Sequence, residues 1–197
     1  MNLLEYTDIF TIREADMSLL DNNNCILLII DIQEKLVAAL KDKSIVTKAV
    51  KLVKAADILG IPVILSEQYP KGLGSTVNEI SSVLPFNTKK YEKVAFSLLK
   101  ENNFIEDLKL YNKKQIIVCG IEAHICVYQT AIELMNAEFE ITVAKDVCAS
   151  RNEYEFNIGM DLIKAAGAHI SCLEIILFEL LKTANHSKFK EIQSLIK

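Results

Sequence analysis

The chain has 197 residues, of which 51% are hydrophobic and 24% are charged. This length and apolar content predict one compact domain with a sizeable core. The formal net charge of -4 and the pI near 5.5, without a dense basic stripe, argue against a protein that holds the phosphates of nucleic acid.

Short apolar segments alternate with longer amphipathic segments from residue 25 onward, a pattern typical of strands alternating with helices. We expect strands at 25–31, from Ile61, at 116–119, near Glu140 and at His169, and helices near 45–59, 127–137 and 153–166. This alternation predicts a three-layer α/β/α domain, in which helices cover both faces of a mostly parallel sheet.

The domain boundaries are expected from the same pattern. Residues 1–20 are an N-terminal extension, residues 21–185 form the domain, and residues 186–197 form a C-terminal helix that belongs to it. The N-terminus mixes acidic with apolar residues, unlike a signal or transit peptide, which predicts a cytoplasmic protein. The apolar segment Leu173–Leu181 is too short to span a bilayer and carries two glutamates, so we expect no membrane partner.

The chain has five cysteines, an odd number without the close pairing typical of disulfide frameworks or zinc sites. We expect buried, reduced thiols. Cys126 has a distinctive position, because it follows an apolar strand and Gly120 and falls at the opening turn of the next helix. Backbone N–H groups and the positive end of the helix dipole favour an anion there, which predicts a stabilised thiolate and a stabilised oxyanion.

Two further residues are placed where they could act on Cys126. Asp31 closes the first strand, and ligands of open parallel sheets bind at the carboxyl ends of strands, so Asp31 and Cys126 share a crevice if their strands are neighbours. Lys93 lies between a strand-like segment and a helix that Ser97 could cap. Asp31 could take the thiol proton and return it to a leaving group, while Lys93 balances the charge.

Each of these residues also has a purely structural interpretation. Cys126 could be a small apolar filler, Asp31 a helix cap, and Lys93 an ordinary surface lysine. The segment Lys71–Ser75 contains two glycines but lacks the GK[ST] ending of a phosphate loop, so we expect a flexible lid over the crevice. A dinucleotide-binding domain is discounted, because no glycine-rich turn follows the first strand.

Three motifs in this order resemble the isochorismatase-like cysteine hydrolase superfamily, which includes nicotinamidases. They are Asp31-Ile32-Gln33, then Lys93 with Phe96 and Ser97, then Gly120 with Cys126, Val127, Thr130 and Ala131. The resemblance covers residues 24–176. Within the superfamily, the segments 66–77 and 120–131 are most similar to the branch of isochorismatase domain-containing proteins.

The resemblance implies an isochorismatase-like, Rossmann-like fold with Asp31, Lys93 and Cys126 as the catalytic set. It also implies a cis peptide bond between Ile121 and Glu122, which would turn the Glu122 N–H towards that of Cys126 and form an oxyanion hole. Nicotinamidases carry an Asp-x-His metal motif where this chain has Ser66-Glu67-Gln68, so we expect no metal and no cofactor. The candidates for binding substrate are Gln33, Glu67, Gln68, Tyr69, Phe96, Glu122 and His124.

The sequence therefore predicts a metal-independent cysteine hydrolase that acts on an amide-like or imide-like C–N bond of a small molecule through a thioester. The alternative is an interaction or scaffold protein that kept the fold without catalysis. We also expect a homo-oligomer, because members of the superfamily commonly assemble and Leu173–Leu181 is apolar. Neither nucleic acid nor a membrane is an expected partner.

Overall fold

A six-stranded sheet forms the centre of the computed structural model, which describes residues 18–101 and 103–197. Its strand order is β3-β2-β1-β4-β5-β6, and neighbouring strands run parallel throughout. The strands are β1 (Cys25–Ile30), β2 (Val63–Gln68), β3 (Lys89–Lys93), β4 (Gln115–Ile121), β5 (Glu140–Ala149) and β6 (His169–Ser171). The predicted parallel sheet is therefore confirmed, while residues 1–17 of the expected N-terminal extension lie outside the described residues.

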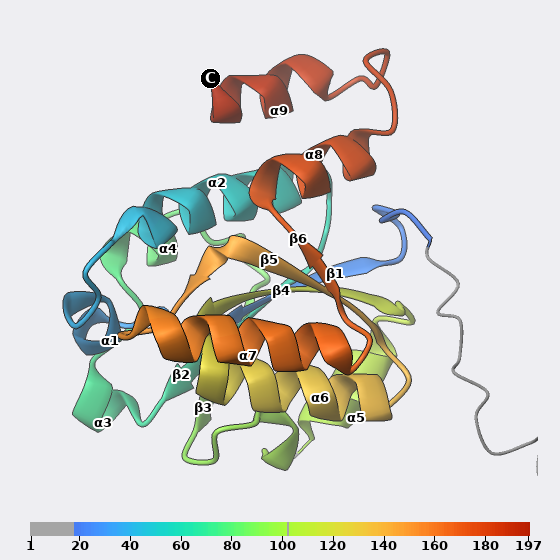
Figure 1. The fold of residues 1–197 in the computed structure, drawn as a ribbon. Helices are drawn as coiled ribbons and strands as arrows, with labels where there is room; N and C mark the ends of the chain where they lie inside the picture. The colour runs from blue at the N-terminus through green and yellow to red at the C-terminus, as the bar shows by residue number, and fades with distance from the viewer. Residues whose placement is uncertain (1–17, 102) are drawn as a thin grey trace, which may run out of the picture.

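Helices cover both faces of this sheet, as the alternating pattern predicts (Figure 1). Helices α5, α6 and α7 lie on one face, and α2 and α8 lie on the other, with α9 stacked outside them. The helices are α1 (Glu34–Ala38), α2 (Ser44–Ile58), α3 (Pro70–Leu73), α4 (Asn78–Ser81), α5 (Phe104–Leu110), α6 (Tyr128–Asn136), α7 (Glu153–Ala165), α8 (Leu173–Leu181) and α9 (Phe189–Ile196), with a 3-10 helix η1 (Leu98–Lys100) and a π-helix η2 (Ala123–Val127). This is the expected three-layer α/β/α architecture.

The two central strands are apolar because both of their faces are covered. Every residue of β1 and of β4 is buried, which matches the near-continuous hydrophobic runs typical of parallel strands. β1 pairs directly with β4, in a register that places Cys25 opposite Gln115 and Ile30 opposite Gly120. Asp31 and the turn that carries Cys126 therefore emerge side by side, because β1 and β4 are neighbours.

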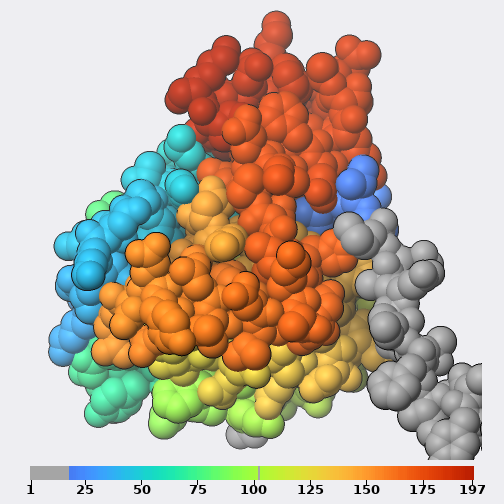
Figure 2. Space-filling view, in the orientation of Figure 1, coloured from blue at the N-terminus to red at the C-terminus, as the bar shows by residue number. Residues whose placement is uncertain are grey.

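The C-terminal helices complete the other face of the molecule. In the apolar helix α8, five residues are buried, namely Leu173, Ile176, Leu177, Leu180 and Leu181. Phe178 on the opposite side packs edge-to-face against Phe189 of α9, with 6.4 Å between ring centroids. The space-filling view shows α8 and α9 rising above the body of the molecule (Figure 2). Much of the apolar surface of this segment is thus buried within the chain itself.

Gly120 allows β1 and β4 to approach each other closely at the site. Its φ is +144°, and a Cβ atom built on it would lie 2.1 Å from the backbone oxygen of Ile30. A side chain at this position would collide with the backbone of β1 just before Asp31. The position therefore requires glycine, both for its conformation and for the lack of space.

In the described part of the chain, none of the helices combines the length and the apolar character that crossing a membrane would require.

Candidate active site

A buried ion pair lies at the point where the strand order reverses. Lys93 Nζ is 2.6 Å from Asp31 Oδ2, and both side chains have no exposed surface. Asp31 follows β1 directly with a left-handed backbone, φ 52°, and Lys93 is the last residue of β3. Because β1, β2 and β3 are parallel neighbours, their carboxyl ends lie at one edge of the sheet, and these distant residues meet there across the end of β2.

Cys126 lies in η2, the π-helical turn that leads from β4 into α6, and only 6% of its surface is exposed. The pKa of its thiol is raised to about 12, chiefly by burial and also by the negative charge of Asp31, while the positive charge of Lys93 opposes both. The structure thus brings Asp31, Lys93 and Cys126 together.

The direction of this pKa shift corrects one expectation. The helix start was expected to stabilise the thiolate, yet the resting Cys126 is held as a thiol. Desolvation disfavours the charged form of a buried thiol, and the neighbouring carboxylate acts in the same direction. A group that removes the proton is therefore needed before the sulfur can attack, and Asp31 is the adjacent base.

Two residues of β2 hold the ion pair in place. The Ser66 hydroxyl donates to Asp31 Oδ1 at 2.7 Å, and Lys93 Nζ donates to Gln68 Oε1 at 2.6 Å. Gln68 in turn donates through Nε2 to the backbone oxygen of Val94. Gln68 thus supports the lysine and the backbone that follows it. These contacts satisfy the buried charges, which burial would otherwise destabilise.

The peptide bond between Ile121 and Glu122 is cis, and it lies at the end of β4, immediately before η2. Glu122 is buried and binds Arg151, whose Nε and Nη2 lie 2.7 and 3.1 Å from its carboxylate oxygens. Burial alone would raise the pKa of the Glu122 carboxyl, but the hydrogen bonds from the side chain and backbone of Arg151 lower it below its usual value. The charged Glu122 thus anchors the cysteine turn to the end of β5.

His124 forms a second anchor for the same turn. Its Nδ1 lies 2.9 Å from Ser150 Oγ, and its Nε2 lies 3.5 Å from Glu155 of α7. Gly159 of α7 packs against this residue, because a Cβ there would lie 2.6 Å from His124 Cα. The contacts of Glu122 and His124 support the turn, so substrate contacts by these two predicted residues stay a prediction.

Gln33 and Glu67 hold the loop that follows β2. The Gln33 amide donates to the backbone oxygens of Gln68 and Gly74 and accepts from the Gln68 N–H, at distances of 2.6–3.1 Å. Glu67 accepts from the Thr76 N–H and hydroxyl, both at 2.8 Å. The segment 71–75 begins within the short helix α3, and the backbone oxygens of Gly72 and Gly74 accept hydrogen bonds from Lys35 and Gln33, while its role as a flexible lid stays a prediction.

Tyr69 and Phe96 are the exposed members of the predicted substrate set. Tyr69 is 55% exposed and Phe96 is 52% exposed. Tyr69 follows β2, and its N–H donates to the backbone oxygen of Lys93 at 2.8 Å, while Phe96 lies three residues beyond Lys93. Both rings are therefore attached to the backbone that carries the ion pair, and both can contact a ligand.

Residues 18–101 and 103–197 contain no group of three or more His, Cys, Asp and Glu side chains that could hold a metal ion. The five cysteines are free thiols, and burial raises the pKa of Cys25, Cys119 and Cys148 as it does that of Cys126. Cys126 differs from these three in having Asp31 and Lys93 beside it.

Sequence reasoning missed Ser66 and Arg151 as members of the site. Ser66 occupies the first position of the Ser66-Glu67-Gln68 motif, and a serine at a strand end gives no signal by itself. Arg151 follows β5, and its partner Glu122 lies 29 positions earlier in the chain. Pairing of oppositely charged residues at the ends of β4 and β5 is a signal that could have found it.

The comparisons with known proteins identify the family of the chain. The Isochorismatase domain matches residues 25–175. Isochorismatase domain-containing protein 2 of Xenopus laevis is 34% identical over 178 residues, 90% of this chain and 85% of that protein.

Two solved structures are similar to this chain in fold. MAR1 ribonuclease of Caenorhabditis elegans has a TM-score of 0.86 at 34% identity and covers 91% of this chain and 92% of its own. The YcaC gene product of Escherichia coli, described as an octameric hydrolase of unknown specificity, shares the fold, with a TM-score of 0.81 at 21% identity over 91% of this chain and 95% of its own. Because the domain match spans most of its length, the chain belongs to the isochorismatase domain family, in the branch of the isochorismatase domain-containing proteins.

Proposed function

We propose that this protein is a metal-independent cysteine hydrolase that cleaves a C–N bond of a small amide-like or imide-like molecule. One observation carries the proposal: the fully buried Lys93–Asp31 ion pair lies beside the thiol of Cys126. A buried ion pair is weak support for stability, whereas a thiol of raised pKa beside a buried carboxylate and a buried ammonium is typical of a catalytic site. Membership of the isochorismatase domain family supports the same chemistry.

In the first half of the reaction, Asp31 accepts the proton of the Cys126 thiol as the sulfur attacks the substrate carbonyl carbon. The new S–C bond displaces the carbonyl electron pair onto oxygen, and the backbone N–H groups of Glu122 and Cys126 hold the resulting oxyanion. When the intermediate collapses, the C–N bond breaks and protonated Asp31 gives its proton to the leaving nitrogen. The product amine departs, and the acyl group stays on sulfur as a thioester.

In the second half, water replaces the amine. Asp31 takes a proton from the water as its oxygen attacks the thioester carbon, and the C–S bond then breaks. The proton returns from Asp31 to the sulfur, so the carboxylic acid leaves and the resting thiol is restored. Lys93 keeps its positive charge throughout and balances the carboxylate when Asp31 is ionised. Tyr69 and Phe96, the exposed rings, are proposed to contact the substrate.

The first prediction concerns turnover. In a screen of small amides, imides and ureas, we expect a hydrolysed compound whose acyl group appears on Cys126 by intact-protein mass spectrometry. Cys126→Ala and Asp31→Ala should each abolish its turnover, because the nucleophile and the base each act in both halves of the reaction. Lys109→Met on the exposed surface of α5 serves as the control and should keep full activity.

Single-stranded RNA belongs in the same screen, because a structural relative carries the name of a ribonuclease. Cleavage of RNA that survives Cys126→Ala would contradict the proposal. So would amide turnover in Asp31→Ala. A scaffold role, the alternative function, would instead show itself as a binding partner retained equally by the wild type and by Cys126→Ala.

The second prediction concerns the pH dependence of alkylation. Because the Cys126 thiol titrates near pH 12, its iodoacetamide labelling rate should keep rising above about pH 9 instead of reaching a plateau near the usual thiol range. Lys93→Met removes the charge that lowers this pKa and should slow labelling. Asp31→Asn removes a charge that raises it and should speed labelling while turnover is lost.

Cys172 is the internal reference for this measurement, because it is partly exposed and its labelling rate should be the same in all three proteins. The rates are read residue by residue by peptide mass spectrometry. If Cys126 labelled no differently in the two variants, the ion pair would not act on the thiol, and the proposed roles of Asp31 and Lys93 would be wrong.

Two further features of the proposal concern assembly and location. The chain is proposed to form a homo-oligomer, and the octameric state described for YcaC supports assembly as a property of this fold. A cytoplasmic location is proposed because all five cysteines are free thiols, which is typical of reducing compartments. The mass of the purified protein by analytical ultracentrifugation tests whether it forms an oligomer. The redox state of its thiols after rapid acid quenching of cells tests the cytoplasmic location.

A further inference from the structure

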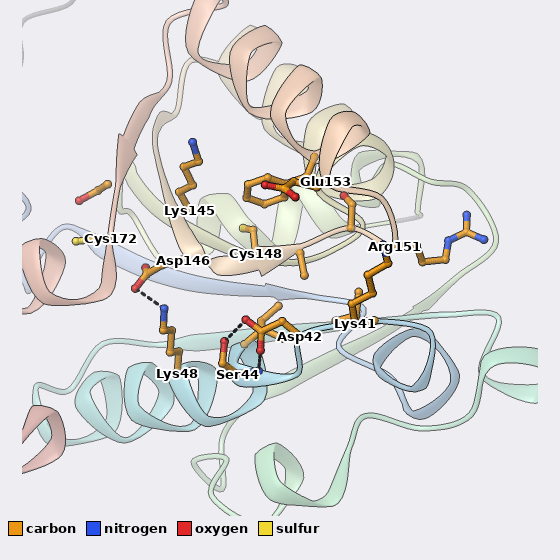
Figure 3. A pocket seen from close by; sticks show the side chains of 16 residues that line it. Lys41, Asp42, Ser44, Lys48, Lys145, Asp146, Cys148, Arg151, Glu153 and Cys172 are labelled. Carbon is orange, nitrogen blue, oxygen red and sulfur yellow. Dashed lines mark hydrogen bonds and ion pairs between the residues drawn. The ribbon is translucent and has the colours of Figure 1, made fainter.

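A cavity lies beside the cysteine turn, and none of its lining residues belongs to the catalytic set. Its volume is about 550 Å³, and it is formed by the start of α2 and the loop before it, the end of β5, the start of α7 and the end of β6. Figure 3 shows Lys145 and Glu153 on one side of Cys148, with Asp42, Ser44 and Lys48 on the other. We call it the β5 cavity.

The β5 cavity has an apolar floor. Leu40, Ile45 and Cys148 line it, and each has less than a tenth of its surface exposed. The ring of Phe156 adds an aromatic wall. Volume and lining of this kind are typical of sites that hold the apolar body of a small organic ligand.

Two of the carboxylates in the lining are already occupied by donors within the protein. Asp42 accepts from the Ser44 N–H and hydroxyl, both at 2.8 Å. Asp146 accepts from the Leu173 N–H at 2.8 Å and pairs with Lys48 at 3.3 Å. Only Glu153 at the exposed rim lacks such a partner among the residues that the structure describes. Lys48 offsets the charge of Asp146, while Asp42 stays charged but has its oxygens engaged by Ser44.

Cationic donors, in contrast, remain available. Lys41 and Lys145 line the cavity, and neither forms an ion pair within residues 18–101 and 103–197. Lys145 Nζ instead lies 5.8 Å from the centroid of the Phe156 ring. Arg151 binds Glu122 through Nε and Nη2, which leaves the donors of its Nη1 for another acceptor. The cavity thus combines cationic donors with an apolar floor.

We infer that the β5 cavity binds a small carboxylic acid with an apolar body, such as an aromatic ring or a short alkyl chain. The carboxylate accepts hydrogen bonds from the lysines at the rim, and the body packs against Ile45, Cys148 and Phe156. Charge-assisted hydrogen bonds of this kind discriminate strongly between an anion and its neutral analogue. The inference is independent of the hydrolase proposal, because Asp31, Lys93 and Cys126 do not line this cavity.

The position of the cavity makes its occupant relevant to the catalytic turn. Ser150 and Arg151 belong to its wall, and the same two residues hold His124 and Glu122 of the cysteine turn. A ligand bound against this wall would therefore contact the two residues that hold the cysteine turn in place. The β5 cavity is therefore joined to the cysteine turn through Ser150 and Arg151.

Benzoate is the probe for the test, with the neutral benzyl alcohol and the cationic benzylamine as matched controls. The full chain, labelled with nitrogen-15, is titrated with each compound while backbone amide shifts are recorded. We expect saturable benzoate shifts in residues 41–48 and 145–151. Lys145→Glu and Lys41→Glu should each weaken the benzoate Kd by about tenfold, which is the effect of losing one charged hydrogen bond.

Lys109→Glu, a charge reversal on exposed α5, is the matched control and should leave the benzoate Kd unchanged. Circular dichroism melts of all variants establish that they are folded. The inference is overturned if benzylamine or benzyl alcohol binds as tightly as benzoate, if the shifts gather around Lys93 and Phe96 instead, or if the two cavity variants bind benzoate like the wild type.

Discussion

Breaking the buried ion pair should cost more stability than any other single charge change at this site. We expect Asp31→Asn or Lys93→Met to lower the free energy of unfolding by about 3–5 kcal/mol, because each leaves an uncompensated charge in the interior. Both side chains are fully buried and lie 2.6 Å apart. The remaining contacts, from Ser66 and to Gln68, are neutral hydrogen bonds that replace only part of the lost interaction.

The double variant Asp31→Asn/Lys93→Met shows whether the lost stability comes from an unpaired buried charge or from altered side-chain packing. Because it removes both charges, it should recover most of the stability that either single variant loses. Urea unfolding followed by circular dichroism measures all four proteins. The exposed pair Lys188–Glu191 gives the reference, since Lys188→Met should cost at most about 1 kcal/mol. Single variants at the site that cost no more than this reference would show that the pair is not buried in solution.

Gly120→Ala should have the second large effect, and it acts through the backbone. Its Cβ would lie 2.1 Å from the Ile30 oxygen and 2.8 Å from the Ile30 carbonyl carbon, atoms of a central strand that cannot move aside. We expect a loss of more than about 4 kcal/mol, in the range that a single substitution reaches only through severe strain or a broken core. Urea unfolding, or the yield of folded protein where unfolding is complete, measures it.

Two other glycines supply the control for conformation alone. Gly60 and Gly167 also have positive φ, at 69° and 108°, but an added Cβ would meet no atom within 4 Å at either position. Gly60→Ala should therefore cost only about 1–2 kcal/mol, the price of a left-handed backbone. If Gly120→Ala cost no more than Gly60→Ala, β1 and β4 would be able to separate at the site, and the close approach described for Gly120 would not hold in solution.

Much of the fold follows from the order of apolar segments along the sequence. The segments 25–31 and 116–119 are continuous and β-branched, and they form the two central strands. Helices α2 and α7 show clear apolar periodicity and begin within a residue of the expected positions. Helices α1, α3 and α4 have only four or five residues, too few for a periodic pattern, so the sequence did not predict them.

The sequence could predict that Asp31 and Cys126 lie close together, but it could not predict the electrostatics of the candidate site. Asp31 and Cys126 stand at strand ends, so topology alone suggests that they meet. The pKa of Cys126 depends instead on how much water the fold removes and on the distance to Asp31, which no sequence pattern contains. Arg151 escaped prediction for a similar reason, because its partner Glu122 becomes its neighbour only after β4 and β5 have paired.

The strand order has a consequence for how the chain is made. β1 lies in the middle of the sheet, with β2 on one side and β4 on the other, yet residues 115–121 of β4 leave the ribosome long after β1, β2 and β3. Until they do, one apolar edge of β1 has no partner, and such edges pair readily with other chains. Until residues 115–121 have been made, the nascent chain therefore exposes this edge of β1, and the sheet that positions Asp31 beside Cys126 cannot yet form.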